Sequence, residues 1–178
     1  EQTKGEIMVY DNEPRLAVFH SESAGKTEDA ENVWEQEIPY LKSVDSSLDK
    51  NAPDFEKSIS YTYDELIKRF SNHYKDFSLD NNQIKILSHT PAGYVQKIQI
   101  GNKTLTGREI REILNLRSSN FTVSIQNNTI VFTTKGYGHG AGMSQYGAEF
   151  MAKEGKTYHE ILQHYYTGIS FSNYTPSI

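Results

Sequence analysis

The sequence predicts an α+β fold, built mainly on antiparallel sheet with short helices and forming a single domain. Two observations support this class. Short strand-like stretches alternate with short helical patterns, and they follow no regular β–α–β period. The chain has 178 residues, which is enough for one domain with a substantial core.

The first forty residues are expected to form a hairpin followed by a capped helical turn. The expected elements are a strand at 6–10, a turn at 11–14, a strand at 15–20 and a helical turn at 27–34. Thr27 is a good N-cap candidate for that turn. Because Ser, Asp, Asn and Pro dominate 41–54, we expect a loop over residues 41–60.

The α+β body is expected over residues 61–178. Its helices are predicted from apolar residues at helical spacing and its strands from alternation. The expected elements are a helix at 62–74, strands within 84–100 around a turn at 91–93, a strand at 104–105, a helix at 108–114 opened by Thr106 or Gly107, a hairpin of 121–125 and 129–134 around Asn127-Asn128, and a helix at 158–166.

Composition excludes several functional classes. The net charge of −5 argues against a nucleic-acid partner, because the sequence has no basic stripe to displace counterions. The absence of cysteine removes disulfides, thiolate catalysis and cysteine-ligated zinc. No apolar run in the sequence approaches the roughly 20 residues of a membrane span.

One run stands out, KGYGHGAGMSQYGAEFMA, with five glycines between Gly136 and Gly147. Glycine is favoured where φ is positive or where backbone approaches another group closely. The run follows a strand-like stretch and precedes a helix-like one. We therefore interpret residues 136–148 as a shaped turn that displays a site.

Several chemistries fit this run poorly. It lacks the Walker lysine and the dinucleotide glycine spacing. His20 and His139 could converge, but a metal site would need further ligands. A serine hydrolase using His139 and Ser144 lacks the nucleophile elbow.

A carbohydrate site fits the residue types better. His139, Ser144, Gln145, Tyr137 and Tyr146 supply neutral hydrogen-bonding groups and aromatic faces. Glycan cleavage also requires a carboxylic acid. The nearby Glu149 and Glu154 are expected to face solvent, so neither is assigned.

The string from Gly136 to Phe171, GYGHGAGMSQYGAEFMAKEGKTYHEILQHYYTGISF, resembles the signature of the stage II sporulation protein D family, whose relatives include amidase-enhancer proteins. The upstream blocks agree in order. They are Phe19-His20-Ser21 with Ser23-Ala24-Gly25-Lys26-Thr27 and Glu31-Asn32-Val33-Trp34, then Pro39-Tyr40-Leu41 with Val44, and Leu105-Thr106-Gly107-Arg108-Glu109-Ile110-Arg111 with Leu116-Arg117-Ser118 and Phe121. The hairpin block is most similar to sporulation members from endospore formers.

This resemblance implies an extracytoplasmic, membrane-anchored lytic transglycosylase that cuts denuded peptidoglycan strands during engulfment. One glutamate would protonate the glycosidic oxygen and then accept the proton of the muramyl 6-hydroxyl, leaving a 1,6-anhydro end. It further implies the sporulation amidase and a membrane protein of the engulfment complex as partners. His139, Ser144, Gln145, Tyr146 and Tyr137 would line the glycan cleft, opposite a wall made by His20, Ser21 and Thr27.

The chain departs from that family pattern in one respect. The family's catalytic glutamate lies in an N-terminal helical block, and this chain begins at about the strand that follows the block, Thr3-Lys4-Gly5-Glu6-Ile7. We therefore expect the single domain to lack this block, and no catalytic residue is assigned. Some members carry zinc on cysteines near the His20 block, so we expect no metal or other cofactor here. The alternative function is a non-catalytic module that stimulates a cell-wall amidase.

Overall fold

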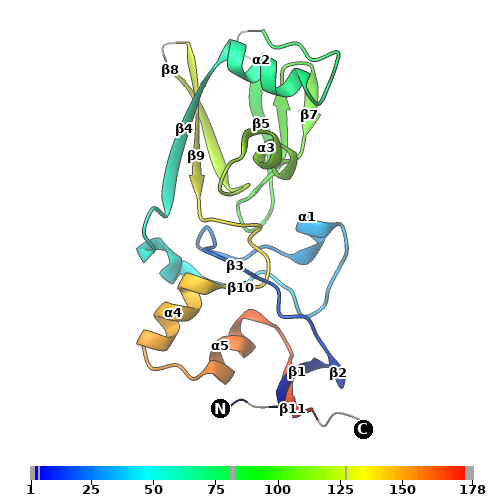
Figure 1. Cartoon of the computed structure of the whole chain (residues 1–178), viewed down its shortest axis with the longest axis vertical. Helices are drawn as coiled ribbons and strands as arrows, with labels where there is room; N and C mark the ends of the chain where they lie inside the picture. The colour runs from blue at the N-terminus through cyan, green and yellow to red at the C-terminus, as the bar shows by residue number, and fades with distance from the viewer. Residues whose placement is uncertain (1–2, 4, 81–82, 127, 175–178) are drawn as a thin grey trace.

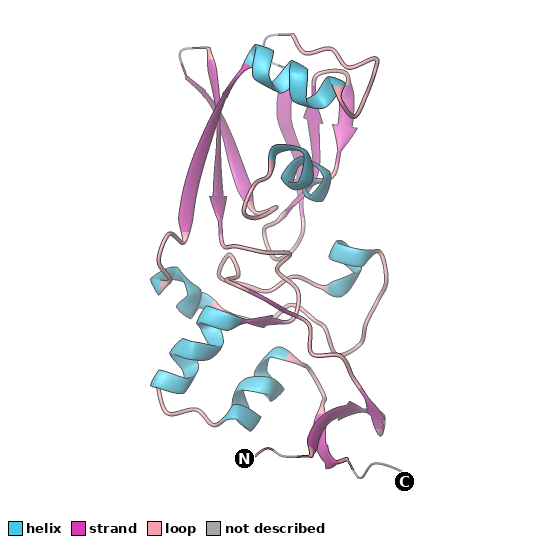
Figure 2. Ribbon diagram, in the orientation of Figure 1, coloured by secondary structure: helices cyan, strands magenta, loops and turns pink. Residues whose placement is uncertain are grey.

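The computed structural model describes residues 3, 5–80, 83–126 and 128–174. The molecule is elongated, with one group of strands and helices at the top of Figure 1 and another around both termini at the bottom. We call these the upper lobe and the lower lobe. Extended segments cross the middle of the molecule between the two lobes (Figure 2).

The upper lobe is one continuous stretch of chain. Its elements are β4 (Glu56–Thr62), α2 (Tyr63–Ser71), β5 (Ile84–His89), β6 (Val95–Ile100), β7 (Lys103–Leu105), α3 (Gly107–Leu114), β8 (Phe121–Gln126) and β9 (Thr129–Lys135). They form two antiparallel three-stranded sheets, in the orders β4-β9-β8 and β5-β6-β7. Helices α2 and α3 each begin at a capping box. The side chains of Thr62 and Thr106 accept a hydrogen bond from the backbone N–H of the glutamate three residues later, and that glutamate accepts one from the backbone N–H of the threonine.

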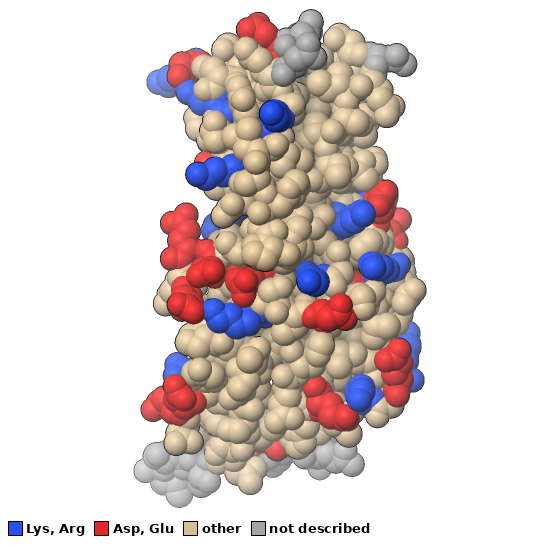
Figure 3. Space-filling view, turned by 180° about the vertical axis from the view of Figure 1, so that it is seen from behind, with Lys and Arg blue, Asp and Glu red and all other residues tan. Residues whose placement is uncertain are grey.

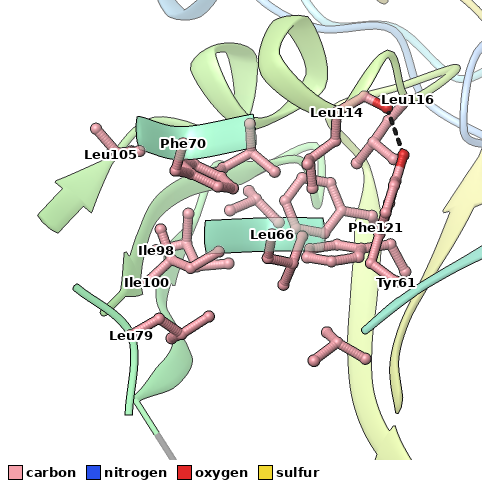
Figure 4. Close-up of a cluster of buried hydrophobic side chains, with 14 of the residues drawn as sticks. Tyr61, Leu66, Phe70, Leu79, Ile98, Ile100, Leu105, Leu114, Leu116 and Phe121 are labelled. Atoms are coloured by element: carbon pink, nitrogen blue, oxygen red, sulfur yellow. Dashed lines mark hydrogen bonds between the residues drawn. The ribbon is translucent and has the colours of Figure 1, made fainter. Parts of the chain in front are cut away.

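A hydrophobic core fills the space between these two sheets (Figure 4). Leu66 and Phe70 from α2 and Ile98 from β6 are fully buried in it. The hydroxyl of Tyr61 is satisfied inside this core, since it donates to the backbone oxygen of Leu114 at 2.8 Å. The core therefore joins α2 and α3 to both sheets.

The lower lobe combines both ends of the chain. Its elements are β1 (Glu6–Tyr10), β2 (Glu13–Pro14), β3 (Phe19–His20), α1 (Ala30–Trp34), the 3-10 helix η1 (Ser47–Asn51), β10 (Met143–Ser144), α4 (Gln145–Lys153), α5 (Tyr158–Tyr165) and β11 (Ser170–Asn173). Strand β1 pairs antiparallel with β2 and β11, and β3 pairs parallel with β10. A second core surrounds Leu41, Tyr165 and Tyr166.

The predicted α+β class with mainly antiparallel sheet is confirmed. Several local predictions are corrected. The strand at 15–20 is limited to Phe19–His20, the turn at 11–14 shortens to its first two residues, the loop at 41–60 contains η1 and the start of β4, the helix at 62–74 ends at Ser71, and α4 already begins at Gln145. Lys4, in the segment Thr3-Lys4-Gly5-Glu6-Ile7, and Asn127, in the expected hairpin turn, lie outside the described residues.

The predicted N-cap at Thr27 is also wrong. Helix α1 begins after Asp29, and the Thr27 hydroxyl instead accepts a hydrogen bond from the Val44 N–H at 2.9 Å. Thr27 is completely buried, so its side chain supports the loop of residues around Val44 rather than the helix. None of the helices in the described part of the chain has the length and apolar character of a membrane span.

Candidate functional site

The glycine-rich run crosses the middle of the molecule, from the end of β9 in the upper lobe to β10 and α4 in the lower lobe (Figure 1). Its backbone is tied to the chain between Val18 and Glu28. Tyr137 exchanges two backbone hydrogen bonds with Glu22, and Gly140 accepts one from the Glu28 N–H at 2.8 Å. These ties explain why the segments around His20 and His139 meet.

At two positions of this run, Gly142 and Gly147, there is no room for a side chain. Gly142 has a φ of +73°, and a Cβ there would lie 2.1 Å from the Val18 backbone oxygen. Gly147 lies inside α4, where a Cβ would lie 2.1 Å from the Tyr165 hydroxyl. Both contacts are far shorter than van der Waals distance, so glycine here allows close packing of backbone.

His139 is half-buried, and both of its ring nitrogens are bonded within the protein. Nδ1 accepts the Ala141 N–H at 3.1 Å, so the proton of the neutral ring lies on Nε2, which donates to the Phe19 backbone oxygen at 3.1 Å. Burial lowers the pKa of His139. The ring therefore presents carbon atoms rather than a free nitrogen, and it packs on Trp34 with ring centroids 5.1 Å apart.

His20 lies directly behind His139, with ring centroids 5.5 Å apart, so the two histidines do converge. His20 is buried, and its Nδ1 donates to the Ala141 oxygen at 3.1 Å. Burial, and then the neighbouring His139, lower the pKa of His20 to about 3. Within the described residues, no group of three or more His, Asp or Glu side chains is arranged to hold a metal ion, and His20 Nε2 is buried without a hydrogen-bond partner.

Ser144 is completely buried at the N-terminus of α4. Its hydroxyl accepts the Gly147 N–H at 3.1 Å and donates to Asp49 Oδ1 at 2.8 Å. The other carboxylate oxygen of Asp49 accepts hydrogen bonds from the Ser23 N–H and the Ser46 hydroxyl. Ser144 and Thr27 are thus buried residues whose hydroxyls bond to other parts of the protein: Ser144 to Gly147 and Asp49, and Thr27 to Val44.

A hollow of about 380 Å³ opens beside His139, between α1 and α3. We call it the α1–α3 hollow, and the residues that matter for its chemistry are Glu28, Glu31, Trp34, Arg108, Arg111 and His139. Arg108 is oriented by the Val33 backbone oxygen and by Glu112, both at 2.9 Å. The hollow therefore combines an aromatic face with fixed guanidinium and carboxylate groups.

Glu28 lies at the bottom of this hollow and is almost fully buried. Its Oε2 accepts the Thr90 hydroxyl at 2.5 Å, and its Oε1 accepts the Asn32 amide and the Asp29 N–H, both at 2.9 Å. Burial raises the pKa of Glu28, and these hydrogen bonds oppose the rise. Because Thr90 belongs to the upper lobe, Glu28 also connects the two lobes.

A second hollow, of about 500 Å³, is lined by residues next to the start of β4, at the start of α4 and in the glycine-rich run. We call it the Tyr137 hollow. Its lining includes Ser21, Asp54, Lys57, Arg117, Tyr137 and Tyr146. Gln145 is exposed at the first position of α4 and is not among the lining residues of either hollow.

The sequence-predicted site residues other than the exposed Gln145 are thus divided among three places. His139 lines the α1–α3 hollow, whereas Ser21, Tyr137 and Tyr146 line the Tyr137 hollow. The buried residues His20, Thr27 and Ser144 lie between or beneath them. Sequence reasoning gave no individual role to Trp34, Glu28, Arg108 and Arg111. Two signals were available: Trp34 is the single tryptophan of the chain, and Trp34, Arg108 and Arg111 belong to the blocks that resemble the family.

The charged surface is mixed rather than basic. On the face shown in Figure 3, Lys and Arg side chains are interspersed with Asp and Glu side chains across the middle and lower parts of the molecule. Glu149 and Glu154, the carboxylates nearest to the run in sequence, are exposed as expected, and Glu149 pairs with Lys153 on α4.

Comparison with known proteins gives clear relatives. The chain is 45% identical over 172 residues to stage II sporulation protein D of Bacillus subtilis (strain 168), which covers 96% of this chain and 49% of that protein. It is 42% identical over 170 residues to the protein of the same name from Bacillus amyloliquefaciens, covering 96% of the chain and 48% of the relative. The chain therefore spans about half the length of these relatives.

A more distant match is the amidase enhancer of Bacillus subtilis (strain 168), which is 28% identical over 225 residues, covering 98% of this chain and 32% of that protein. No protein-family model matches the chain. The resemblance predicted from the glycine-rich run and its upstream blocks is confirmed by the two sporulation relatives.

Proposed function

We propose that this chain, which belongs to the stage II sporulation protein D family, forms the glycan-binding portion of a peptidoglycan lytic transglycosylase. The observation that carries the proposal is the α1–α3 hollow, where the Trp34 ring packs on the neutral His139 ring beside fixed arginine and glutamate side chains. Sugar rings bind to aromatic faces through their C–H groups, while planar polar side chains bind their hydroxyl and N-acetyl groups.

In this proposal His139 acts through its ring and not through a nitrogen. Both nitrogens are bonded to backbone groups, so the ring is held as a rigid, uncharged support for Trp34. Arg108 and Arg111 supply hydrogen-bond donors at the side of the hollow formed by α3. These groups would fix the sugar on one side of the scissile bond and leave the proton transfer to another residue.

The proton donor is proposed to lie on a segment outside these 178 residues. Its carboxylic acid would protonate the departing glycosidic oxygen, and the resulting carboxylate would accept the proton of the muramyl 6-hydroxyl as that oxygen attacks C1. The products are one strand with a 1,6-anhydromuramyl end and one with a free hydroxyl. Glu28 is not assigned this role, because both of its oxygens accept hydrogen bonds within the protein.

The cellular setting is part of the same proposal. We place the whole protein outside the cytoplasm in the septal space, anchored in the membrane by an N-terminal segment beyond these residues. It would act on denuded strands during engulfment, together with the sporulation amidase and a membrane protein. The names of the sporulation relatives support the general setting of spore formation.

Product analysis tests the enzymatic proposal. The full-length protein is incubated with peptidoglycan strands freed of stem peptides, and the products are separated by chromatography and identified by mass spectrometry. We expect new 1,6-anhydromuramyl ends, and fewer of them with Trp34→Ala. Unchanged strands, or new reducing muramyl ends, would contradict the transglycosylase proposal.

The similarity to an amidase enhancer favours one alternative. In that case the chain would bind glycan without cutting it and would stimulate a cell-wall amidase. The discriminating measurement is release of stem peptides from intact peptidoglycan by a purified amidase, with and without the full-length protein. Stimulated peptide release without anhydromuramyl ends would favour the alternative.

A further inference from the structure

Strand β4 forms an open edge of the upper lobe. It ends the sheet of order β4-β9-β8, and in the described part of the chain no strand pairs with its second side. In Figure 1 it runs along the left side of the upper lobe. An edge strand presents unpaired N–H and C=O groups, and these can pair with a strand of another molecule.

The other edges of the upper lobe are better protected than β4. Strand β7 is only three residues long and holds Lys103, and strands β5 and β8 contact each other across the two sheets. Strand β4 has seven residues in regular register with β9 and no proline. Its only charged residues are the first two, Glu56 and Lys57. Short strands, charges and prolines protect natural edges, so β4 is the least protected edge of this lobe.

The backbone of β4 directs alternate residues to the open side. One position before β4, the Gly136 N–H donates to the Phe55 oxygen at 2.9 Å. Hydrogen-bonded pairs alternate along an antiparallel ladder, so the odd-numbered residues of β4 bond to β9. The even-numbered residues, which include Ser58 and Ser60, therefore direct their N–H and C=O groups to the open side.

A row of apolar side chains on the core side of the sheet ends at this edge. Ile59 lies opposite Phe132, and Phe132 lies opposite Val123. Phe132 is fully buried, whereas Ile59 is still 39% exposed because it is the last residue of the row. A strand added to the edge of β4 would cover Ile59.

The sequence of β4, Glu-Lys-Ser-Ile-Ser-Tyr-Thr, is complementary to itself when two copies run antiparallel with Ile59 at the centre. Ile59 then lies opposite Ile59 of the second copy, and Ser58 lies opposite Ser60. Like charges directly opposite each other would destabilise such a pair. Here each charged residue meets an uncharged one, and these pairs are Glu56 with Thr62 and Lys57 with Tyr61.

This register also agrees with the backbone. It brings Ser58 and Ser60, whose N–H and C=O groups face the open side, into hydrogen-bonded pairs between the two copies. A pairing centred on Ser58 would place Lys57 opposite Ile59 in the apolar row. A pairing centred on Ser60 would leave Glu56 and Lys57 without an opposite strand residue. The sequence therefore favours the pairing that is centred on Ile59.

We infer that the open edge of β4 is a homodimer interface, at which two copies of this protein pair their β4 strands antiparallel about Ile59. The pairing joins two sheets into one of order β8-β9-β4-β4-β9-β8, and its two-fold symmetry leaves no β4 edge open. Among the residues of β4, only Lys57 lines either hollow, so the interface is distinct from the candidate site and does not depend on the proposed function. Because one strand pair buries less than a standard interface, we expect a dissociation constant on the order of 10–100 µM.

Sedimentation velocity of the full-length protein, over a concentration series that spans this dissociation constant, tests the inference. We expect monomer to convert to dimer as the concentration rises. Ile59→Lys should abolish the dimer, because it removes the apolar contact and places two cations opposite each other. Ser60→Pro should also abolish it, because proline removes an N–H that bonds only to the second copy.

Ile125→Lys is the matched control. Ile125 is 42% exposed on β8, at the other edge of the same sheet, so it resembles Ile59 in burial and in secondary structure. This variant should dimerise like the wild-type protein. Circular dichroism checks that the Ile59, Ser60 and Ile125 variants are folded.

Cysteine cross-linking tests the register. These 178 residues contain no cysteine, and any cysteine elsewhere in the full-length protein is replaced by serine. In the proposed dimer the two Ile59 Cα atoms lie about 4.5 Å apart, a distance that a disulfide can span. Ile59→Cys should therefore form a disulfide-linked dimer under mild oxidation, whereas Ile125→Cys should stay monomeric. Ser58→Cys should cross-link to Ser60→Cys faster than to itself.

Several results would overturn the inference. They are a monomer at every concentration, a dimer that Ile59→Lys and Ser60→Pro leave intact, and equal cross-linking of Ile59→Cys and Ile125→Cys. Cross-linking of Ile59→Cys only to a different protein would assign the edge to a foreign strand and would also overturn it. Oligomeric state and cleavage are measured separately, so the homodimer and the transglycosylase proposal can fail independently.

Discussion

Replacing Ser144 by alanine removes one hydroxyl that makes two buried hydrogen bonds. The hydroxyl caps α4 by accepting the Gly147 N–H at 3.1 Å, and loss of an N-cap costs about 1 kcal/mol. It also donates to Asp49 Oδ1 at 2.8 Å, and leaving a buried acceptor without its donor costs about 1–3 kcal/mol. We therefore expect Ser144→Ala to lower the free energy of unfolding by about 2–4 kcal/mol.

The assay is equilibrium urea unfolding followed by far-ultraviolet circular dichroism. Thr157→Ala is the matched control, because Thr157 caps α5 through the Glu160 N–H at 3.3 Å but its hydroxyl contacts only exposed groups. It should cost about 1 kcal/mol, the cap contribution alone. If both variants lose the same stability, the reasoning about the buried carboxylate is refuted.

A double-mutant cycle isolates the buried contact further. In the Asp49→Ala background, Ser144→Ala should cost only about 1 kcal/mol, because the carboxylate that it would leave without a donor is already gone. A cost of about 2–4 kcal/mol in that background would show that Ser144 stabilises the fold by another route. If instead Ser144 bound sugar directly, Ser144→Ala would weaken glycan binding at a temperature where the variant is fully folded.

Four further predictions can be tested on the same protein. His139→Ala should impair glycan binding and cleavage without unfolding the protein; unchanged values would make His139 purely structural. Glu28→Gln should reduce cleavage less than tenfold, whereas loss of a general acid would cost about 10²–10⁴. Gly142→Ala should lower the urea concentration at the midpoint of unfolding, because the new Cβ would lie 2.1 Å from the Val18 backbone oxygen. An unchanged midpoint would show that the backbone around Gly142 can shift to make room for the Cβ. The pKa of His20 is lowered by burial from 6.5 to about 3, so the unfolded chain binds the proton first. The free energy of unfolding should therefore fall by about 2 kcal/mol more in the wild-type protein than in His20→Gln between high pH and pH 5. If the free energies of unfolding of the two proteins change in parallel with pH, this prediction is wrong.

Local signals predicted much of the upper lobe. The helix opened by Thr106 or Gly107 and the alternation across residues 84–100 depend on neighbours in sequence, and both elements formed where they were expected. The lower lobe was harder, because its short elements depend on distant partners. Strand β3 is only two residues long and exists because it pairs with β10, over 120 residues away.

The candidate site shows the same limit. The glycine-rich run was recognisable from its composition, but what its neighbours contribute depends on the folded chain. Gly147 would weaken a helix by propensity, yet α4 includes it because Tyr165 leaves no space for a side chain. Trp34 and Asp49 are about 100 residues from the run, and no local pattern indicates that they contact His139 and Ser144.

The alternation of glycine with larger residues in this run has a structural meaning. Gly136 and Gly138 have positive φ values, and a Cβ at either would meet the Glu22–Ser23 backbone or the His20 side chain at less than 3 Å. The glycines are therefore the positions that pack inwards, and the residues that alternate with them, Tyr137 and His139, are directed to the two hollows. A substitution at a glycine should disturb both hollows together, whereas a substitution at Tyr137 or His139 should affect one. If the two hollows bind neighbouring parts of a single strand, this arrangement couples them through backbone that is too tightly packed to move independently.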